Sequence, residues 1–135
     1  MSEKRILIVD DEYDFAETLA ERLQLRDFTA EAVGNAVEAL SKIHDGYLPE
    51  VVLLDLKLPG LDGLEILDLI KQYDRTIEVI MVTGHGSTAS GIAGMQRGLF
   101  DYLMKPVDIG ELVGKINQAV EKRRKAKAEL AGGQQ

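Results

Sequence analysis

The sequence predicts an α/β fold in which a doubly wound, five-stranded parallel sheet lies between two layers of helices. Five short apolar segments alternate with segments whose apolar residues recur at helical spacing. Most of these apolar segments lack the alternation of a half-exposed strand, which indicates strands that are buried on both faces, as in a parallel sheet. Helices that join consecutive parallel strands imply right-handed crossovers and a three-layer α/β/α arrangement.

The predicted strands are short and are bounded by polar or turn residues. The first is expected at residues 6–9, where four apolar residues precede two aspartates. The second, at 28–33, alternates in polarity and is therefore expected at an edge of the sheet. The remaining strands are expected at 51–54, 79–82 and 102–104, of which the last is the least regular.

Helices are predicted between the strands and after the last one. Apolar residues recur on one face within 15–23 and within 109–120. Helix starts are indicated by an Asn or Asp that is followed three residues later by Glu, which resembles a capping box. The three pairs are Asn35 with Glu38, Asp62 with Glu65, and Asp108 with Glu111.

The segment 84–98 is the poorest helix former in the chain. Gly91 and Gly94 lie within it, and each costs about 1 kcal/mol of helix stability relative to Ala. If this segment is helical, it should be the helix that shifts most easily.

Composition limits the classes of protein to consider. A length of 135 residues fits one domain with a single core. The absence of Cys excludes a disulfide framework and any Cys-based zinc or redox site. The first apolar run is only four residues long, so neither a signal peptide nor a membrane span is expected there, and a cytoplasmic protein fits best.

Charge is distributed unevenly along the chain. The net charge is −7, but residues 122–135 hold five of the 16 basic residues and one of the 23 acidic residues. Residues 1–121 are expected to form the domain, whose acidic character argues against direct nucleic-acid binding. Residues 122–135 are expected to form a basic helical extension with a flexible end at 132–135. A solvated helix end is the simplest interpretation; a docking surface, a dimer contact or the start of a linker to an output domain remain alternatives.

Polar side chains follow four of the strands at the point where each strand ends. Asp10 and Asp11 follow the first strand, Asp55 the third, Thr83 the fourth and Lys105 the fifth. Ligands of open α/β sheets bind beyond this edge. Three converging carboxylates repel one another unless a cation compensates them, and an oxygen-rich, sulfur-free set favours Mg²⁺. Such a site suits a phosphoryl group bonded to a carboxylate.

Four segments resemble the motifs of bacterial response-regulator receiver domains. They are IVDDE at 8–12, LLDLKLPGLDG at 53–63, VTGHG at 82–86 and FDYLMKP at 100–106, and the resemblance covers residues 4 to about 121. It implies a flavodoxin-like fold with strand order 2-1-3-4-5. It also implies a phosphoacceptor module of two-component signalling, which is no enzyme beyond its own phosphotransfer and autodephosphorylation. Its partner would be a sensor histidine kinase or a histidine phosphotransfer protein.

The resemblance implies a role for each acidic residue of the site. Asp55 matches the aspartate that accepts the phosphoryl group. Asp11 matches a direct Mg²⁺ ligand, and Asp10 matches a residue that acts on the metal through water. The backbone carbonyl of Lys57 would complete the metal site.

The resemblance also implies how the signal leaves the site. Thr83 matches a hydroxyl that turns toward the new phosphoryl group, and Lys105 matches the lysine that pairs with it. Tyr102 matches an aromatic switch whose ring changes burial on activation, although the residue can also be only part of the core. The Lys105–Pro106 bond is expected to be cis, a state that proline makes accessible. The fourth helix, fifth strand and fifth helix would form the surface for an effector, an output domain or a second copy.

Three positions depart from the common pattern of these domains. Lys57 and His85 stand where side chains line the entry for attacking water and tune the lifetime of the phosphoryl group. Leu99 stands where a small residue is common, so the packing near Tyr102 is expected to differ.

The main alternative is a Mg²⁺-dependent phosphatase with an aspartyl nucleophile. That class usually places a second Asp two residues after the nucleophile, where this chain has Lys57. It also needs a cap or a deep pocket, for which 135 residues leave little room. A receiver-like domain that binds partners without phosphorylation would lack parts of the acidic cluster, all of which are present here.

Overall fold

The computed structural model describes residues 3–132, in which five strands and five helices alternate. The strands hydrogen-bond in the order β2-β1-β3-β4-β5, and every pair is parallel. The predicted fold class and strand order are confirmed, with β2 at an edge of the sheet. The strands are β1 (Arg5–Val9), β2 (Thr29–Val33), β3 (Val51–Leu54), β4 (Glu78–Thr83) and β5 (Asp101–Met104).

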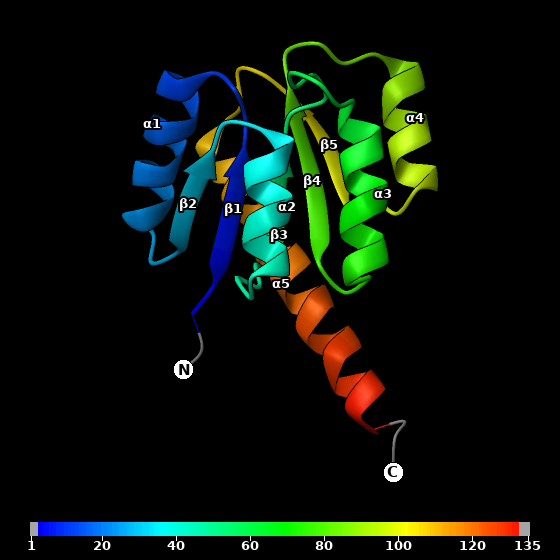
Figure 1. Cartoon of the computed structure of the whole chain (residues 1–135). Coiled ribbons are helices and arrows are strands. Elements are labelled where there is room, and N and C mark those ends of the chain that lie inside the picture. Colours follow the sequence, from blue (N-terminus) through cyan, green and yellow to red (C-terminus); the bar gives the residue numbers. More distant parts are fainter. Residues whose placement is uncertain (1–2, 133–135) are drawn as a thin grey trace.

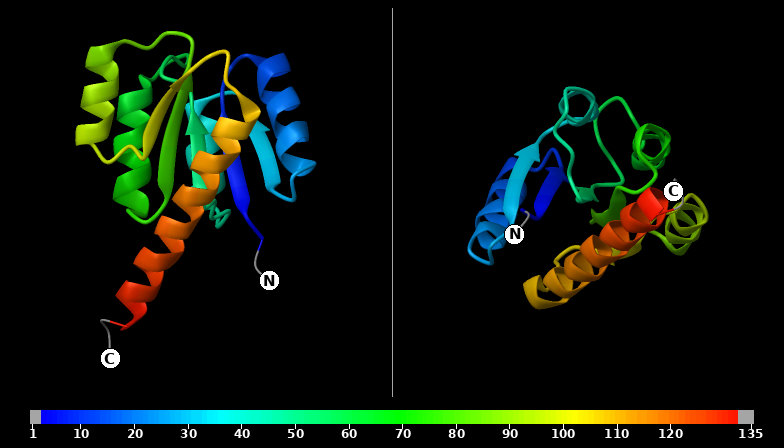
Figure 2. Two further views of the ribbon diagram at one scale, coloured as in Figure 1. Left: turned by 180° about the vertical axis from the view of Figure 1, so that it is seen from behind. Right: turned by 90° about the horizontal axis from the view of Figure 1, so that it is seen from below.

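The helices cover both faces of the sheet. One core lies between the sheet and helices α1 and α5, and a second core lies between the sheet and α2 and α3. Figure 2 shows these two layers from behind and from below. The helices are α1 (Tyr13–Gln24), α2 (Ala36–His44), α3 (Gly63–Tyr73), α4 (Thr88–Gln96) and α5 (Ile109–Gly132).

Strand β1 shows why an unbroken apolar run was needed. Ile6 and Ile8 belong to the core under α1 and α5, whereas Leu7 and Val9 belong to the core under α2 and α3. Successive side chains of a strand point to opposite faces of the sheet. A central strand therefore supplies both cores, and polar residues first appear where the strand ends.

The helix starts that were predicted from capping pairs are confirmed. In each case a side-chain oxygen accepts a hydrogen bond of 2.9 Å from a backbone N–H in the first turn, which satisfies a group that the helix leaves unpaired. The capping residues are Asn35, Asp62 and Asp108, and the donors are Glu38, Leu64 and Gly110. The start of α4 at Ser87, whose hydroxyl accepts from Ser90 N–H, was not identified from the sequence.

Helix α4 has the smallest buried face. Gly94 is its only buried residue, and Ile92 and Met95 are about half exposed. Gly94 also explains how the chain accommodates Leu99, because a Cβ at position 94 would lie 2.8 Å from Leu99 Cδ2. The large residue at 99 is thus matched by the missing side chain at 94, and the ease with which α4 shifts stays a prediction.

Helix α5 continues well past the sheet (Figure 1) but is attached to it by ion pairs. The Arg124 guanidinium donates to both carboxylate oxygens of Glu50, with Nε 2.9 Å from Oε2. Arg123 is 5% exposed and lies 3.5 Å from Asp74. The interpretation of the basic run as a solvated helix end holds for the exposed Lys125 but is wrong for these two arginines.

A third acidic side chain lies at the same end of the sheet. The buried Glu78 carboxylate is 3.5 Å from Lys71 Nζ and 3.6 Å from Lys122 Nζ. Burial lowers the pKa of Lys71 and outweighs the opposing effect of Glu78. We call this group of charged residues the amino edge; it consists of Glu50, Lys71, Asp74, Glu78, Lys122, Arg123 and Arg124.

The remaining expectations about the chain as a whole have mixed outcomes. Of the predicted flexible end at 132–135, residues 133–135 lie outside the described part, and Gly132 belongs to α5. None of the helices in the described part is both long enough and apolar enough to span a bilayer.

Candidate functional site

Three aspartates meet where β1 and β3 end. Asp10 and Asp11 follow β1, and Asp55 follows β3, so the parallel pairing of these strands brings them to one edge. One carboxylate oxygen from each of the three lies within 4.8 Å of the others. Asp10 and Asp55 are 3% and 2% exposed, whereas Asp11 is open to solvent. The structure therefore brings together the acidic residues that the sequence analysis selected.

The two oxygens of Asp55 have different partners. Thr83 at the end of β4 donates its hydroxyl to Oδ1 over 2.6 Å, and the backbone N–H of Lys57 approaches the same oxygen at 3.3 Å. Lys105 Nζ lies 3.5 Å from Oδ2. The carboxylate is thus held in a fixed orientation, with one oxygen facing the acidic cluster and a cation.

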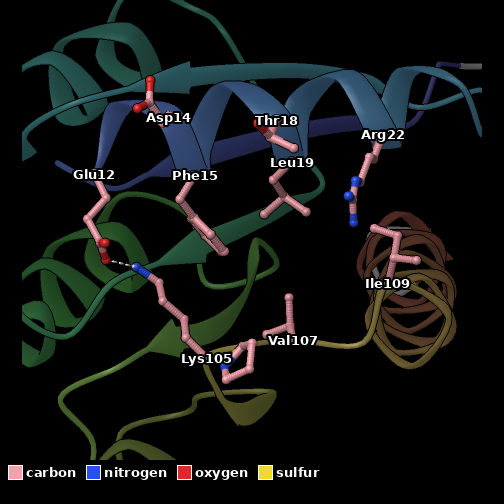
Figure 3. Close-up of a pocket in the computed structure, with 10 residues that line it drawn as sticks. Glu12, Asp14, Phe15, Thr18, Leu19, Arg22, Lys105, Val107 and Ile109 are labelled. Atoms are coloured by element: carbon pink, nitrogen blue, oxygen red, sulfur yellow. Dashed lines mark hydrogen bonds and ion pairs between the residues drawn. The ribbon is translucent and has the colours of Figure 1, made fainter.

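Lys105 links the acidic cluster to helix α1. Its ammonium lies 2.8 Å from Asp10 Oδ2 and forms a close ion pair with Glu12. It also lies 4.2 Å from the centre of the Phe15 ring, a cation–π contact. Figure 3 shows Glu12 and Phe15 projecting from the start of α1 toward Lys105, across the mouth of a cavity between α1 and the β5–α5 connection. The bond between Lys105 and Pro106 is cis, as predicted.

The electrostatics of the site are those of an excess of carboxylates. Burial raises the pKa of Asp10, although hydrogen bonding from Lys105 and from Glu12 N–H opposes the rise. Burial lowers the pKa of Lys105, but its hydrogen bonds to Asp10 and Glu12 raise it by more. Ionised carboxylates at this density are stabilised by further positive charge. Their oxygen-only donor set, partly open to solvent at Asp11, fits a hard divalent cation such as Mg²⁺.

Tyr102 reaches from β5 into the loop that follows Thr83. Its hydroxyl is buried and has no hydrogen-bond partner among the described residues. A Cβ at Gly86 would lie 1.5 Å from this hydroxyl oxygen, so the ring occupies its position only because residue 86 has no side chain. The same loop is tied to the site, since His85 N–H donates to Thr83 Oγ1 over 3.1 Å.

Lys57 and His85 line a surface hollow that does not include Lys105, together with residues of the β3–α3 connection and Ser90 of α4. Two of the three positions that depart from the common pattern therefore line one hollow. Lys57 contributes its N–H to Asp55, and the role of its carbonyl as a metal ligand stays a prediction.

Two contributors to the site were missed in the sequence. Glu12 stands within the IVDDE motif but received no role, and Phe15 was assigned only to the buried face of its helix. A third acidic residue directly after two aspartates was the available signal for Glu12. Nothing in the local sequence indicated that Phe15 would contact a lysine 90 positions later.

Known proteins show the same arrangement of sequence and fold. The family described as response regulator receiver domain matches residues 6–117, most of the chain. This chain belongs to that family. A receiver domain protein described as CheY-like, from Methanospirillum hungatei, superposes with a TM-score of 0.87 at 32% identity, covering 93% of this chain and 99% of that one.

Curated relatives of this receiver domain include a nitrogen assimilation regulatory protein and a DNA-binding response regulator. The nitrogen assimilation regulatory protein NtrX of Azorhizobium caulinodans is 37% identical over 121 residues, which cover 88% of this chain and 26% of that protein. The DNA-binding response regulator MtrA of Mycobacterium tuberculosis is 32% identical over 127 residues, 94% of this chain and 55% of MtrA. The chain thus spans between about a quarter and a little over half of these relatives.

Proposed function

We propose that this receiver domain accepts a phosphoryl group on Asp55 from the phosphohistidine of a sensor histidine kinase or of a histidine phosphotransfer protein. One observation carries the proposal. The Asp55 carboxylate is buried and oriented by Thr83, and its second oxygen faces Lys105 and the neighbouring aspartates. A carboxylate whose orientation is fixed among groups that can neutralise spread negative charge has what phosphoryl transfer requires.

The transfer itself uses the residues in distinct ways. A carboxylate oxygen of Asp55 forms a bond to phosphorus while the phosphorus–nitrogen bond of the donor breaks, and the imidazole nitrogen keeps the bonding electron pair. Lys105 and the Thr83 hydroxyl bind the oxygens of the transferred group. Asp10, Asp11, Asp55 and the Lys57 carbonyl would hold Mg²⁺, which supplies charge neutralisation to the phosphoryl oxygens.

A conformational change would follow from the new charge. Phosphorylation adds strong acceptor oxygens next to Thr83, whose hydroxyl is also bound by the loop that encloses Tyr102. Moving such an equilibrium from almost all inactive to almost all active takes about 5.5 kcal/mol of differential interaction. Charge-assisted contacts from Lys105 and Thr83 are of a kind that can supply much of this.

The surface that would change is formed by α4, β5 and α5. The large apolar side chains that α4 and β5 expose are those of Ile92, Met95 and Met104. We propose that a downstream effector, an output domain or a second copy of the chain binds there. Direct contact with nucleic acid is not proposed, because the chain carries a net charge of −7. A cytoplasmic location fits a module of this kind.

Turnover of other substrates is not part of the proposal. The position two residues after Asp55 holds Lys57 rather than the acid that an aspartyl phosphatase would use. Beyond accepting the phosphoryl group, the domain would catalyse only the hydrolysis of its own acyl phosphate.

The test is labelling with a small-molecule phosphodonor. Incubation with acetyl phosphate and Mg²⁺ should add one phosphoryl group, seen by intact mass and lost in alkali. The Asp55→Asn variant should show no label, while Asp68→Asn, a matched change at a partly exposed residue of α3, should label like the wild type. Equal labelling of Asp55→Asn would refute the assignment, and rapid hydrolysis of a phosphomonoester would instead favour the phosphatase.

A further inference from the structure

Glu12 occupies a position that its residue type does not explain. It is the N-cap residue of α1, but its side chain makes no capping hydrogen bond. Ser, Thr, Asp and Asn are preferred at an N-cap because the oxygen of a short side chain can accept from the free N–H groups of the first turn. The Glu12 carboxylate instead extends across to Lys105. Its length therefore serves the contact with Lys105 and not the helix.

The ammonium of Lys105 is surrounded by carboxylates and an aromatic ring. An ammonium offers three N–H donors, and Lys105 has carboxylate neighbours in Glu12, Asp10 and Asp55. Its face toward α1 is covered by the Phe15 ring. Only 11% of the side chain is exposed, so water has little access to it. A phosphoryl group on Asp55 would bind this ammonium in competition with the acceptors that it already has in Asp10 and Glu12.

Glu12 is the acceptor that an arriving group would displace. Asp10 and Asp55 belong to the buried cluster of oxygens that fits a divalent cation, whereas Glu12 lies outside this cluster and is 58% exposed. A displaced Glu12 carboxylate can be hydrated at once, while a displaced Asp10 would remain buried.

We propose that Glu12 is a positioning residue that holds the Lys105 ammonium toward α1 and competes with the phosphoryl group for it, which slows the phosphorylation of Asp55. The proposal rests on the function proposed above. The Glu12 end of this ion pair is exposed to solvent, and ion pairs of exposed groups contribute little, so removing the pair should accelerate labelling by only about two- to five-fold. Glu12 does not contact the reacting atoms, and its effect is transmitted through Lys105.

The first test compares two neutralised residues of the same helix turn. Asp14 lines the same cavity but points away from Lys105 in Figure 3. Glu12→Gln should be labelled by acetyl phosphate and Mg²⁺ about two- to five-fold faster than the wild type, and Asp14→Asn at the wild-type rate. Equal acceleration in both variants would show a general effect of negative charge, and unchanged or slower labelling of Glu12→Gln would show that Glu12 does not compete. Either result overturns the proposal.

The second test does not depend on phosphorylation. Nuclear relaxation of the ¹⁵N-labelled lysine ammonium groups should show a restricted Lys105 in the wild type and in Asp14→Asn, and a more mobile one in Glu12→Gln. Unchanged mobility of Lys105 in Glu12→Gln would show that Glu12 does not hold the ammonium, even if labelling failed altogether. Absence of label on the wild type would refute the proposed function instead, so the two failures are distinguishable.

Discussion

Carboxylates gather at both ends of the sheet, but the number of basic side chains that compensate them differs between the two ends. At the amino edge, Glu50, Asp74 and Glu78 each lie within 3.6 Å of a basic side chain of their own. At the carboxyl edge, defined as Asp10, Asp11, Asp55, Thr83 and Lys105, the single ammonium of Lys105 is shared by Asp10, Asp55 and the adjacent Glu12. Both edges bury carboxylates, but only at the amino edge does each carboxylate have a basic side chain of its own.

This difference separates the structural role of charge from its functional role. A buried ion pair that is complete holds two elements in register, and removing one partner leaves an uncompensated charge. A carboxylate cluster that lacks countercharge weakens the fold until a cation or a donor group supplies it. The amino edge is therefore expected to stabilise the folded chain. The carboxyl edge is expected to bind Mg²⁺ and to lower the stability of the folded chain when no metal is bound.

Neutralising one residue of the amino edge should produce the largest loss of stability. Glu50→Gln removes the charge-assisted fork to Arg124 and should lower the free energy of unfolding by about 1–2 kcal/mol, less than for a fully buried pair because Arg124 is partly exposed. Urea denaturation measures the loss. Glu31→Gln, which breaks the exposed pair with Lys42, should change stability by no more than about 0.5 kcal/mol. Equal losses of stability in Glu50→Gln and Glu31→Gln would mean that the ion pair of Glu50 stabilises the fold no more than a surface ion pair does.

The matching substitution at the carboxyl edge should have the opposite sign. Because burial raises the pKa of Asp10, the folded chain binds its proton more tightly than the unfolded chain does, and stability falls as pH rises through the folded pKa. Asp10→Asn removes this pH-dependent loss of stability and should raise the free energy of unfolding at neutral pH, measured in EDTA. The advantage of the variant should shrink as the pH is lowered through the Asp10 pKa.

Magnesium should make the wild type more stable than Asp10→Asn. Mg²⁺ that binds only the folded state stabilises it by mass action, and the wild type should gain more than Asp10→Asn because the variant lacks one carboxylate of the cluster. Denaturation curves with and without Mg²⁺ provide the measurement. A variant that is less stable than the wild type without the metal would show that the carboxyl edge is already balanced by Lys105.

A substitution in the loop beside the carboxyl edge should change the position of one side chain more than it changes stability. Gly86→Ala places a methyl group 1.5 Å from the Tyr102 hydroxyl oxygen and 2.7 Å from Met104 Sδ, but both belong to side chains that can rotate away, so the cost should stay near the lower end of the roughly 1–3 kcal/mol that is usual for overpacking. The Tyr102 ring should become exposed, as nitration mapped by mass spectrometry would report. Gly91→Ala is the control, because its Cβ would lie at an ordinary 3.6 Å from the ring. A protected Tyr102 in Gly86→Ala would mean that the loop moves instead.

Features that depend on neighbouring residues could be predicted from the sequence. The unbroken apolar runs determine which strands are buried on both faces, and the position of Asp55 directly after such a run places it at the carboxyl edge. Parallel topology then brings Asp10 and Asp11 beside it. The proximity of these residues is confirmed, while their roles in metal binding and phosphorylation stay predictions.

Features that depend on partners far along the chain could not be predicted. Glu12 and Lys105 are 93 residues apart, and Arg124 and Glu50 are 74 apart. In the sequence, Arg124 is one member of a basic run, and nothing local distinguishes it from the exposed Lys125. Which members of a charged run face inward depends on the angle at which the helix crosses the sheet, and that angle is set by the whole core.

The attachment of α5 has a practical consequence for anyone who shortens this chain. A fragment cut at residue 121, where the sequence places the domain boundary, would discard Arg123 and Arg124 and strip Glu50 and Asp74 of their counterions. The resulting fragment would keep every group around Asp55, but its fold would be less stable because ion pairs at the other end of the sheet are lost. Trimming is better done beyond 124, so that poor behaviour of a truncated sample is not mistaken for a fault in its signalling chemistry.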